Sequence, residues 1–269
     1  MSAFPTTHGT EPAFAPPASP ARCFALIPSA GVGARARTEG QPAWPKQYQA
    51  LCGRPVLAHT LAAFEALGPA LSGVAVVLSP EDSVWAQVMT ELAAPSAGQA
   101  VTLLRCGGAS RADSVRQGLA AWCAQPDGPQ PQDWVLVHDA ARCLVTPAQI
   151  QALMDACLGD AVGGLLALPL ADTLKTEVDG RVSHTLERAH KWLAQTPQMF
   201  RFGALARALE AAAAQGAPVT DEASAMEAQG LAPRLVAGSA HNFKITYPQD
   251  FSLAEAVLRA RSLAKKDLP

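Results

Sequence analysis

Short apolar runs that alternate with helical stretches restrict the fold of this chain more than any other feature. The runs span residues 23–27, 74–78, 101–104, 134–137 and 164–168. Strands this uniformly apolar are typical of a sheet that is covered by helices on both faces. The sequence therefore predicts an α/β fold with a Rossmann-like, doubly wound, mainly parallel sheet.

Capping residues mark where two of the helices begin. Ser79 and Thr146 each precede a proline and are followed three residues later by Asp82 and Gln149, a pattern that caps a helix N-terminus. Both caps follow predicted strands. Further helices are expected over residues 202–215, 221–228 and 249–263.

Residues 169–190 interrupt this alternation. Two strand-like segments, 170–178 and 181–186, flank the dipeptide Asp179-Gly180, which favours a two-residue hairpin turn. An isolated two-stranded hairpin is marginal in water, so a protruding arm needs a surface to pack on. A second copy of the chain is the simplest such surface, and we expect a homodimer joined through this β-hairpin arm.

The rest of the chain fits one domain over residues 22–265. Of its 269 residues, 49% are hydrophobic and 16% are charged, which is ample for a buried core. Residues 1–21 are rich in Pro and Ala and follow no period, so we expect a disordered tail there.

Charge and cysteine usage narrow the class of function. The formal net charge of -2 gives no basic field, so no nucleic-acid partner is expected. No apolar run approaches the roughly 20 residues that cross a bilayer, and no signal peptide is apparent. Six cysteines without a C-x-x-C pattern are typical of free thiols in a reducing cytosol and not of a metal site. We expect a cytoplasmic protein with small-molecule partners.

Small residues form a turn directly after the first predicted strand. The turn comprises Ser29, Ala30, Gly31, Val32 and Gly33, with Arg35 and Lys46 downstream. Small residues let backbone N–H groups approach a polyanion, and the two cations can neutralise it. The spacing is neither G-x-G-x-x-G nor a P-loop. The alternative is a tight turn with a surface Arg and Lys.

A second glycine turn begins at Gly107 and Gly108, after the predicted strand 101–104. Ser110 and Asp113 have the spacing of a helix cap, which explains both residues without a ligand. Two such turns at the carboxyl ends of parallel strands flank the crevice where these folds bind ligands.

Charged residues follow another buried strand. Asp139 and Arg142 lie just beyond residues 134–137, where an unpaired charge is costly, so they need a ligand or an internal Asp139–Arg142 ion pair. Lys244 lies in the short segment 242–246, and if that segment is a strand, its ammonium needs an anion or open water.

The late motif Thr220-Asp221-Glu222 is explained to first order by a capped helix. An acid in the first turn of a helix is favoured by the helix dipole, and two acids follow Thr220. This motif therefore indicates no ligand by itself.

Six motifs, taken in order, resemble the 2-C-methyl-D-erythritol 4-phosphate cytidylyltransferase family. They are P-x-A-G-x-G followed by P-K-Q-Y, G-G-x-x-R-x-D-S-V, V-H-D-A-A-R, T-P-Q, T-D-E-A-S and N-x-K-x-T. The resemblance runs from about Cys23 to Ala260. It implies transfer of the cytidylyl group of CTP to 2-C-methyl-D-erythritol 4-phosphate, with release of pyrophosphate, in non-mevalonate isoprenoid precursor synthesis. It also implies Mg²⁺, or another divalent cation, held mainly by the CTP phosphates.

The resemblance also implies roles for individual residues. Around the cytidine it places Ser29, Ala30, Gly31, Gly33, Gly108 and Ser114. Lys46 would hold the triphosphate, and Arg35 matches the last basic residue of the first loop. Beside the substrate polyol it places Asp139, Ala140 and Arg142. Thr196 and Lys244 would grip the substrate phosphate, and Thr173 and Arg188 would come from the arm of the neighbouring subunit. Ala109 stands where other members have an aspartate.

Two alternatives remain at this point. One is a cytidylyltransferase for another polyol phosphate, such as ribitol phosphate. The other is a regulatory protein that senses CTP without turnover. Lys46, Arg188 and Lys244 together favour two phosphate groups brought close, whereas a sensor needs only one phosphate site.

Overall fold

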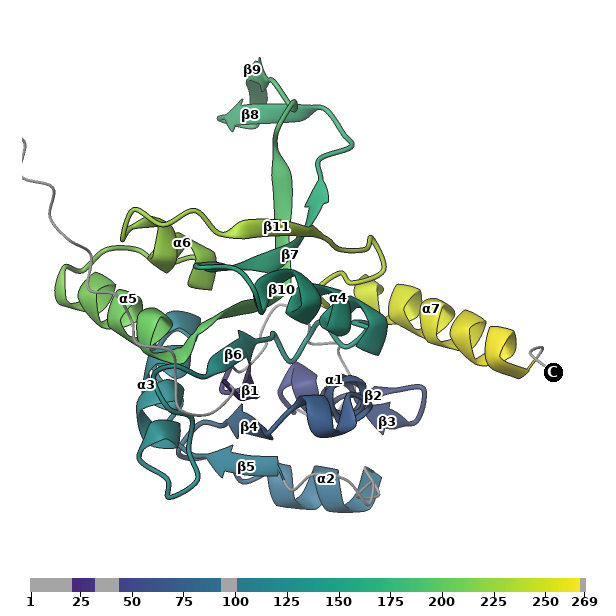
Figure 1. Cartoon of the computed structure of the whole chain (residues 1–269). Helices are drawn as coiled ribbons and strands as arrows, with labels where there is room; N and C mark the ends of the chain where they lie inside the picture. The colour runs from purple at the N-terminus through teal and green to yellow at the C-terminus, as the bar shows by residue number, and fades with distance from the viewer. Residues whose placement is uncertain (1–20, 32–43, 93–100, 267–269) are drawn as a thin grey trace, which may run out of the picture.

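A central sheet organises the computed structural model, which describes residues 21–31, 44–92 and 101–266 (Figure 1). Its strands are β1 (Cys23–Pro28), β4 (Gly73–Val77), β5 (Val101–Leu104), β6 (Trp134–Val137), β7 (Gly163–Pro169), β10 (Trp192–Arg201) and β11 (Arg234–Ala237). Within the described segments the sheet has seven strands in the order β11-β7-β10-β6-β1-β4-β5. Only β10 runs antiparallel to its neighbours, β6 and β7. The predicted α/β, mainly parallel sheet is confirmed.

The helices lie close to where the sequence predicts them, with one correction. They are α1 (Val56–Glu65), α2 (Trp85–Leu92), α3 (Arg111–Cys123), α4 (Pro147–Cys157), α5 (Phe202–Ala214), α6 (Glu222–Glu227) and α7 (Gln249–Lys266), with short 3-10 turns at η2 (Lys46–Tyr48) and η3 (Gly68–Ala70) and a small ladder of β2 (Ala50–Leu51) with β3 (Arg54–Pro55). The capping box of Thr146 and Gln149 is confirmed at α4. The helix start at Ser79 is wrong, because Oδ1 of Asp82 accepts from the N–H groups of Val84 and Trp85 and α2 begins there.

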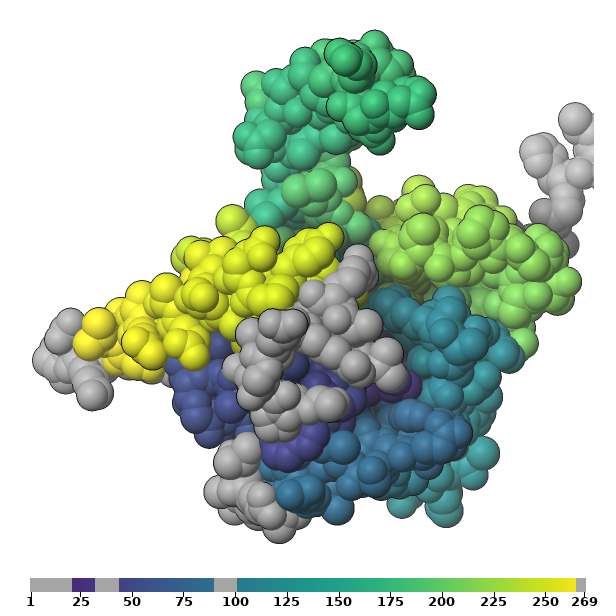
Figure 2. Space-filling view, turned by 180° about the vertical axis from the view of Figure 1, so that it is seen from behind, coloured from purple at the N-terminus to yellow at the C-terminus, as the bar shows by residue number. Residues whose placement is uncertain are grey.

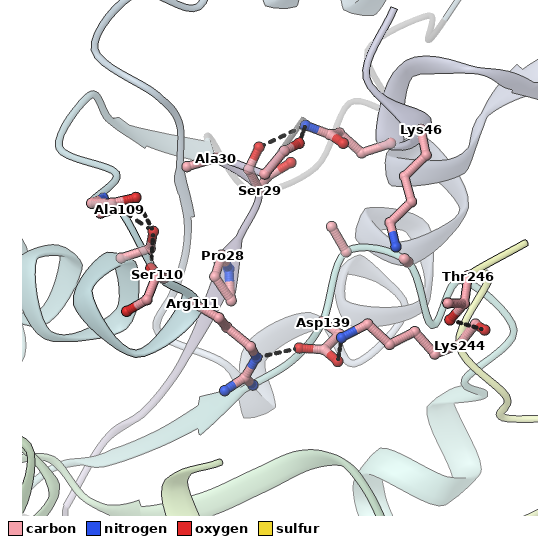
Figure 3. A pocket seen from close by; sticks show the side chains of 16 residues that line it. Pro28, Ser29, Ala30, Lys46, Ala109, Ser110, Arg111, Asp139, Lys244 and Thr246 are labelled. Atoms are coloured by element: carbon pink, nitrogen blue, oxygen red, sulfur yellow. Dashed lines mark hydrogen bonds and ion pairs between the residues drawn. The ribbon is translucent and has the colours of Figure 1, made fainter. Parts of the chain in front are cut away.

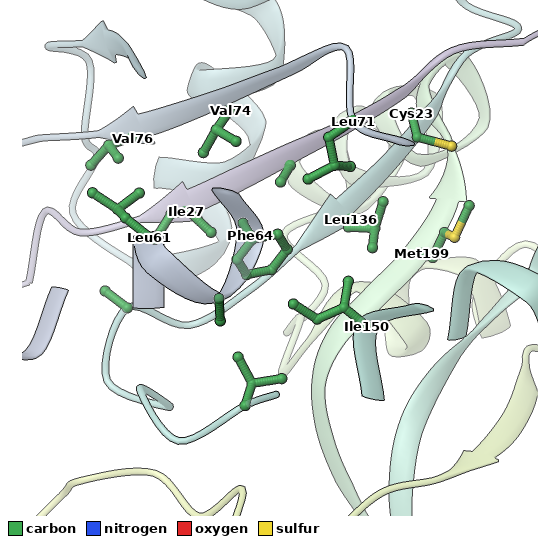
Figure 4. Close-up of a cluster of buried hydrophobic side chains, with 14 of the residues drawn as sticks. Cys23, Ile27, Leu61, Phe64, Leu71, Val74, Val76, Leu136, Ile150 and Met199 are labelled. Carbon is green, nitrogen blue, oxygen red and sulfur yellow. The ribbon is translucent and has the colours of Figure 1, made fainter. Parts of the chain in front are cut away.

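Helices cover both faces of the sheet because side chains alternate along each strand. In β1, Ala25 and Ile27 pack in one cluster with residues of α1 and α4, part of which is drawn in Figure 4. Phe24 and Leu26 pack on the opposite face in a cluster with residues of α3 and α5. This confirms the doubly wound arrangement and explains why the strand reads as a continuous apolar run.

The β-hairpin arm stands clear of the body of the molecule (Figures 1 and 2). Strands β8 (Leu174–Val178) and β9 (Arg181–Leu186) pair antiparallel. Asp179 and Gly180 have φ values of 50° and 74°, as the predicted two-residue turn requires. Val178 and Val182 are 55% and 64% exposed, so the arm leaves apolar side chains uncovered within one chain.

Two sequence predictions fall mostly outside the described residues. The predicted tail, apart from residue 21, lies there, and so do Gly33 and Arg35 of the first loop. Within the described segments, no helix combines the length and apolar character that a membrane span needs.

Candidate active site

A cavity of about 540 Å³ lies at the carboxyl ends of the central strands (Figure 3). Its walls are the residues that follow β1, the turn between β5 and α3, and the residues that follow β6. The chain winds from β1 to β4 and β5 and then crosses back to β6 on the other side of β1. The cavity therefore sits at a topological switch point, where open α/β sheets bind ligands.

The structure brings most of the predicted site residues to this cavity. The predicted residues that line it are Ser29, Ala30, Gly31, Lys46, Gly108, Ser114, Asp139, Ala140 and Lys244. Gln47, Ala109 and Arg111 also line it, although the sequence assigns Gln47 and Arg111 no role. Ala109 presents only a methyl group where an aspartate would present a carboxylate.

The two small-residue turns touch each other across the cavity floor. A Cβ atom added to Gly107 would lie 2.2 Å from Cβ of Ala30 and 2.9 Å from the carbonyl oxygen of Leu78. The backbone N–H of Gly107 donates to that same oxygen at 2.8 Å. Only glycine allows this approach, so the prediction that the two turns flank one crevice is confirmed.

Gln47 fixes the first turn from the side. Its Nε2 donates to the carbonyl oxygens of Ser29 at 2.8 Å and Gly31 at 3.1 Å. Because Gln47 lies on η2 directly after Lys46, the same short element orients the turn and carries the lysine. The motif P-K-Q-Y therefore does two things: its glutamine fixes the shape of the first turn, and its lysine lies beside that turn.

The second turn is held by side chains of the helix that follows it. Ser110 accepts from the backbone N–H of Asp113 at 3.0 Å, which confirms the predicted cap of α3. Oγ of Ser114 accepts from the N–H of Gly108 at 3.1 Å and donates to the carbonyl of Ser110 at 2.9 Å. These bonds explain why small and hydroxyl residues recur here, and they leave the turn rigid beside the cavity.

Asp139 is the point where the cations of the site converge. Its Oδ1 lies 2.6 Å from Nε of Arg111, and its Oδ2 lies 2.8 Å from Nζ of Lys244. Nε of Arg142 is 3.8 Å from Oδ2, so the Asp139–Arg142 pair considered from the sequence is the longer contact. Burial alone would raise the pKa of Asp139, but Arg111 and Lys244 more than offset it and hold that pKa well below its usual range. The carboxylate is therefore ionised at neutral pH.

Arg111 bridges Asp139 to a second acid. Its Nη1 and Nη2 lie 2.7 Å and 3.0 Å from the two oxygens of Glu222, whose side chain is 1% exposed. Burial alone would lower the pKa of Arg111, but the two carboxylates raise it above its usual range. The helix predicted from the T-D-E-A-S motif is confirmed, but its cap is Asp221 and not Thr220, because the Asp221 side chain accepts from the N–H of Ser224. The additional role of Glu222 is hidden in the sequence, because the helix dipole already accounts for an acid at that position.

Lys244 is held by an irregular loop, and not by a strand. Segment 242–246 forms no ladder. Ile245 anchors it: its side chain is fully buried, and its N–H donates to the carbonyl of Ala141 at 2.9 Å. The carbonyl of Ile245 accepts from Nζ of Lys46 at 2.9 Å. The two lysines thus meet at one cavity although they are far apart in sequence (Figure 3).

Thr196 supports Asp139 from behind. Its Oγ1 accepts from the N–H of Asp139 at 3.0 Å and lies 3.0 Å from Nδ1 of His138. Burial lowers the pKa of His138 to about 4, so its imidazole is neutral. Nε2 of His138 faces the carbonyl of Arg142 at 3.1 Å and must carry the proton, so Thr196 donates to Nδ1. The only proton of the Thr196 hydroxyl is therefore donated to His138, and Thr196 is not among the described residues that line the cavity.

Three further predicted residues do not line the described cavity within one chain. The Arg142 guanidinium donates to the carbonyls of Asn242 and Ala194, and so ties the segment after β6 to β10 and to the segment that carries Lys244. Thr173 and Arg188 are exposed on the arm, where Arg188 contacts the carbonyl of Ala171. None of the three belongs to the described lining of the cavity.

The fold and the cavity together define a nucleotidyltransferase. Backbone turns at the switch point can receive a nucleotide, and lysines from two distant segments can receive phosphate groups on either side of it. Residues 23–260 match the family described as IspD: 2-C-methyl-D-erythritol 4-phosphate cytidylyltransferase, and the chain belongs to this family.

Individual relatives agree with this assignment. The chain is 57% identical over 242 residues to the bifunctional enzyme IspD/IspF of Albidiferax ferrireducens, covering 90% of this chain but only 54% of that protein. It is 51% identical over 239 residues to the 2-C-methyl-D-erythritol 4-phosphate cytidylyltransferase of Chromobacterium violaceum, covering 88% of this chain and 98% of that one. The chain thus spans about half of the bifunctional relative and nearly all of the single-function one.

Solved structures match as well. A crystal structure of 4-diphosphocytidyl-2C-methyl-D-erythritol synthase is 38% identical with a TM-score of 0.73, covering 88% of this chain and 98% of that one. The enzyme from Francisella tularensis is 32% identical with a TM-score of 0.71, covering 88% and 99% of the two chains.

Proposed function

We propose that the chain transfers the cytidylyl group of CTP to 2-C-methyl-D-erythritol 4-phosphate, releasing pyrophosphate and forming 4-diphosphocytidyl-2-C-methyl-D-erythritol. The observation that carries the proposal is the convergence of Lys46 and Lys244 on one cavity beside two small-residue turns. Two phosphate groups repel each other in water, and a cleft with a cation for each can hold them within reacting distance. A CTP sensor would need only one of these phosphate sites.

The nucleotide side is formed by the two turns. Residues 29–31 and Gly108 present small groups and backbone to the cavity, as close approach to a base and ribose requires. Lys46, on the same element as the residue that fixes the first turn, reaches the triphosphate. The hydrogen bonds of Gln47 and Ser114 keep both turns in place before the nucleotide arrives.

The acceptor side is formed by Asp139 and Lys244. Each oxygen of the ionised Asp139 carboxylate already has one cationic partner, yet a carboxylate oxygen accepts from more than one donor. Asp139 can therefore accept a hydroxyl of the polyol while Lys244 turns to the substrate phosphate. Ala140 lies beside them in the cavity wall.

The reaction is a displacement at the α-phosphorus of CTP. An oxygen of the acceptor phosphate forms the new P–O bond, the bond from the α-phosphorus to the bridging oxygen of the β-phosphate breaks, and pyrophosphate leaves with the electron pair. No covalent enzyme intermediate is needed, because a phosphate dianion is already a nucleophile. The work of the protein is positioning and stabilisation of the charge that moves to the leaving group, the role we give to Lys46 and Arg35.

The cavity fits a Mg²⁺ ion that is carried by the nucleotide. Asp139 is the one carboxylate among the described lining residues, and both its oxygens face cations. The described part of the chain holds no cluster of three His, Cys, Asp or Glu side chains that could bind a metal ion. A Mg²⁺ ion bound by triphosphate oxygens and water needs no such cluster and would neutralise the triphosphate charge.

We further propose that two chains form a homodimer through the arm. The exposed Val178 and Val182 support this, because a lone two-stranded hairpin with uncovered apolar side chains is only marginally stable. In the dimer, Thr173 and Arg188 of the partner subunit would complete the acceptor side. Mixing inactive Arg188→Ala and Lys244→Ala proteins should then regenerate activity, since one site of a mixed dimer keeps both groups. Lack of recovery despite proven subunit exchange would contradict the shared site.

The state of the cysteines supports a cytoplasmic location. All six cysteines, at positions 23, 52, 106, 123, 143 and 157, are free thiols. Burial raises the pKa of Cys143 to about 12, so this thiol is protonated and inert at neutral pH. Free thiols of this kind persist in reducing compartments.

Pyrophosphate release tests the proposed reaction. The purified chain is supplied with Mg²⁺ and CTP, ATP, GTP or UTP, with and without methylerythritol phosphate, and with ribitol phosphate as the competing acceptor. We expect release only with CTP and methylerythritol phosphate together. Faster release with ribitol phosphate would favour the other polyol substrate, and CTP binding without release under any condition would favour the sensor.

A further inference from the structure

We propose that Glu222 is a positioning residue that divides the Asp139 carboxylate between Arg111 and Lys244. By occupying the two terminal nitrogens of Arg111, it leaves Arg111 only one nitrogen for Asp139 and keeps the other oxygen of Asp139 for Lys244. This inference rests on the proposed function and adds a residue from α6, a helix that contributes no described residue to the cavity lining.

The contacts are specific to this division. Glu222 meets Nη1 and Nη2 of Arg111 at 2.7 Å and 3.0 Å, which is the bidentate geometry that a carboxylate and a guanidinium favour. Only Nε of Arg111 is directed at Asp139, and it reaches Oδ1 at 2.6 Å. Oδ2 is then open to Lys244 at 2.8 Å. Each acid oxygen in the cluster therefore has its own cationic nitrogen.

Burial makes this arrangement sensitive to the loss of Glu222. The side chains of Glu222 and Asp139 are 1% and 9% exposed, and that of Arg111 is 26% exposed, so water can replace little of a missing contact. Without the Glu222 charge, Asp139 is the one carboxylate left in this cluster to pair with the Arg111 guanidinium. A bidentate Arg111–Asp139 pair would then occupy both oxygens and release Lys244.

The sharing of Asp139 between Arg111 and Lys244 also connects the nucleotide-binding side of the cavity to the acceptor side. Arg111 is the first residue of α3 and follows directly on the nucleotide-binding turn, whereas Asp139 and Lys244 face the acceptor. The Ser110 cap and the Gly108–Ser114 bond hold the nucleotide turn independently of Glu222. Loss of Glu222 should therefore disturb the acceptor far more than CTP.

Steady-state kinetics of Glu222→Gln test the proposal. We expect kcat/KM for the acceptor to fall about 10²-fold, because a misplacement of about 1 Å in an active site typically costs a factor of this size. The Kd for CTP should change less than about twofold. The matched control is Asp133→Asn. Asp133 is likewise a buried acid, 3% exposed, paired to a partly exposed arginine, Arg22 at 2.9 Å, but it lies outside the described cavity lining. This control should lose stability and keep its kinetic constants.

A second variant separates positioning from simple loss of a buried ion pair. In Arg111→Met/Glu222→Gln the guanidinium that competes with Lys244 for Asp139 is absent, so the Asp139–Lys244 contact should return. We expect this double variant to recover part of the acceptor kcat/KM that Glu222→Gln loses. A role confined to stability predicts the opposite, because the double variant lacks more contacts.

Crystal structures supply a readout that does not depend on activity. In Glu222→Gln, we expect Nζ of Lys244 to lie beyond 4.0 Å from Asp139 and Arg111 to contact both Asp139 oxygens. An unchanged cluster, equal losses in CTP and acceptor binding, or kinetics like those of Asp133→Asn would overturn the positioning role. An inactive wild-type chain would instead refute the proposed function, while these structures would still decide how Asp139 is shared.

Discussion

Replacing Gly107 with alanine perturbs the contact between the two small-residue turns. The added Cβ would lie 2.2 Å from Cβ of Ala30, whereas carbon atoms pack at about 3.5–4.0 Å. The turns would have to separate by about 1.5 Å, and the added Cβ would also lie too close to the carbonyl oxygen of Leu78, at 2.9 Å. Because the proposed function has both turns bind the same nucleotide, their separation should act on CTP directly.

Gly107→Ala should lower both the activity with CTP and the stability of the fold. Displacement of a binding group by about 1 Å costs on the order of 10²-fold in rate, so kcat/KM for CTP in Gly107→Ala should fall by at least about 10²-fold. Overpacking should also lower the free energy of unfolding by about 1–3 kcal/mol. Pyrophosphate release at varied CTP concentration measures the first effect, and urea unfolding measures the second.

Two further variants make this result interpretable. Gly159→Ala is the matched control, because a Cβ there meets no atom within 4 Å, and it should behave as the wild type. Ala30→Gly/Gly107→Ala removes the closer of the two clashes and should recover part of the loss. Gly107→Ala with CTP kinetics within twofold of the wild type would refute the close approach of the two turns.

Three other predictions address charge, metal and pH. Lys46→Ala should lower kcat by about 10² or more, measured by pyrophosphate release, because a charge used at the leaving group is lost; near-normal turnover would remove Lys46 from the chemistry. Chelation by EDTA should abolish pyrophosphate release and added Mg²⁺ restore it, and full activity in EDTA would contradict a metal-bound triphosphate. The pKa of His138 is about 4 in the folded chain, against 6.5 for a solvent-exposed histidine in an unfolded chain, so stability present above pH 6.5 should be lost as pH falls towards 4, by up to about 3 kcal/mol. Urea unfolding of wild type and His138→Gln measures this, and identical pH profiles would contradict it.

Five of the seven strands in the described central sheet could be predicted from strand composition, and β10 and β11 could not. All five apolar runs are strands. Four of them are largely buried on both faces, which explains their continuous apolar sequence, whereas β5 lies at the edge of the sheet and is only partly buried. β10 was not predicted, because its centre reads Gln195, Thr196, Pro197 and Gln198. The pairing of β10 with β7 shifts register between Ala194 and Gln198, and this irregularity accommodates a proline inside a central strand.

Site residues could be predicted only where they belong to a short motif that is recognisable in the sequence. Glycines and lysines in turns stand out from their neighbours, and the cavity contains them. Glu222 and Gln47 do not stand out, because each already has a local explanation in a helix or turn. Their partners are the side chain of Arg111 and the carbonyl of Ser29, and neither pairing can be read without the fold.

The charges of the site explain how the acceptor side that we propose can be organised before any substrate binds. Asp139 and Glu222 carry two negative charges, and Arg111, Lys244 and the more distant Arg142 carry three positive ones, so both buried acids have cationic partners. This pairing avoids the cost of burying an unpaired carboxylate. When an acceptor phosphate arrives, Lys244 exchanges one anion for another, and Asp139 keeps Arg111 as its partner. The lysine therefore never stands uncompensated, and only its own side chain has to move to receive the approaching anion.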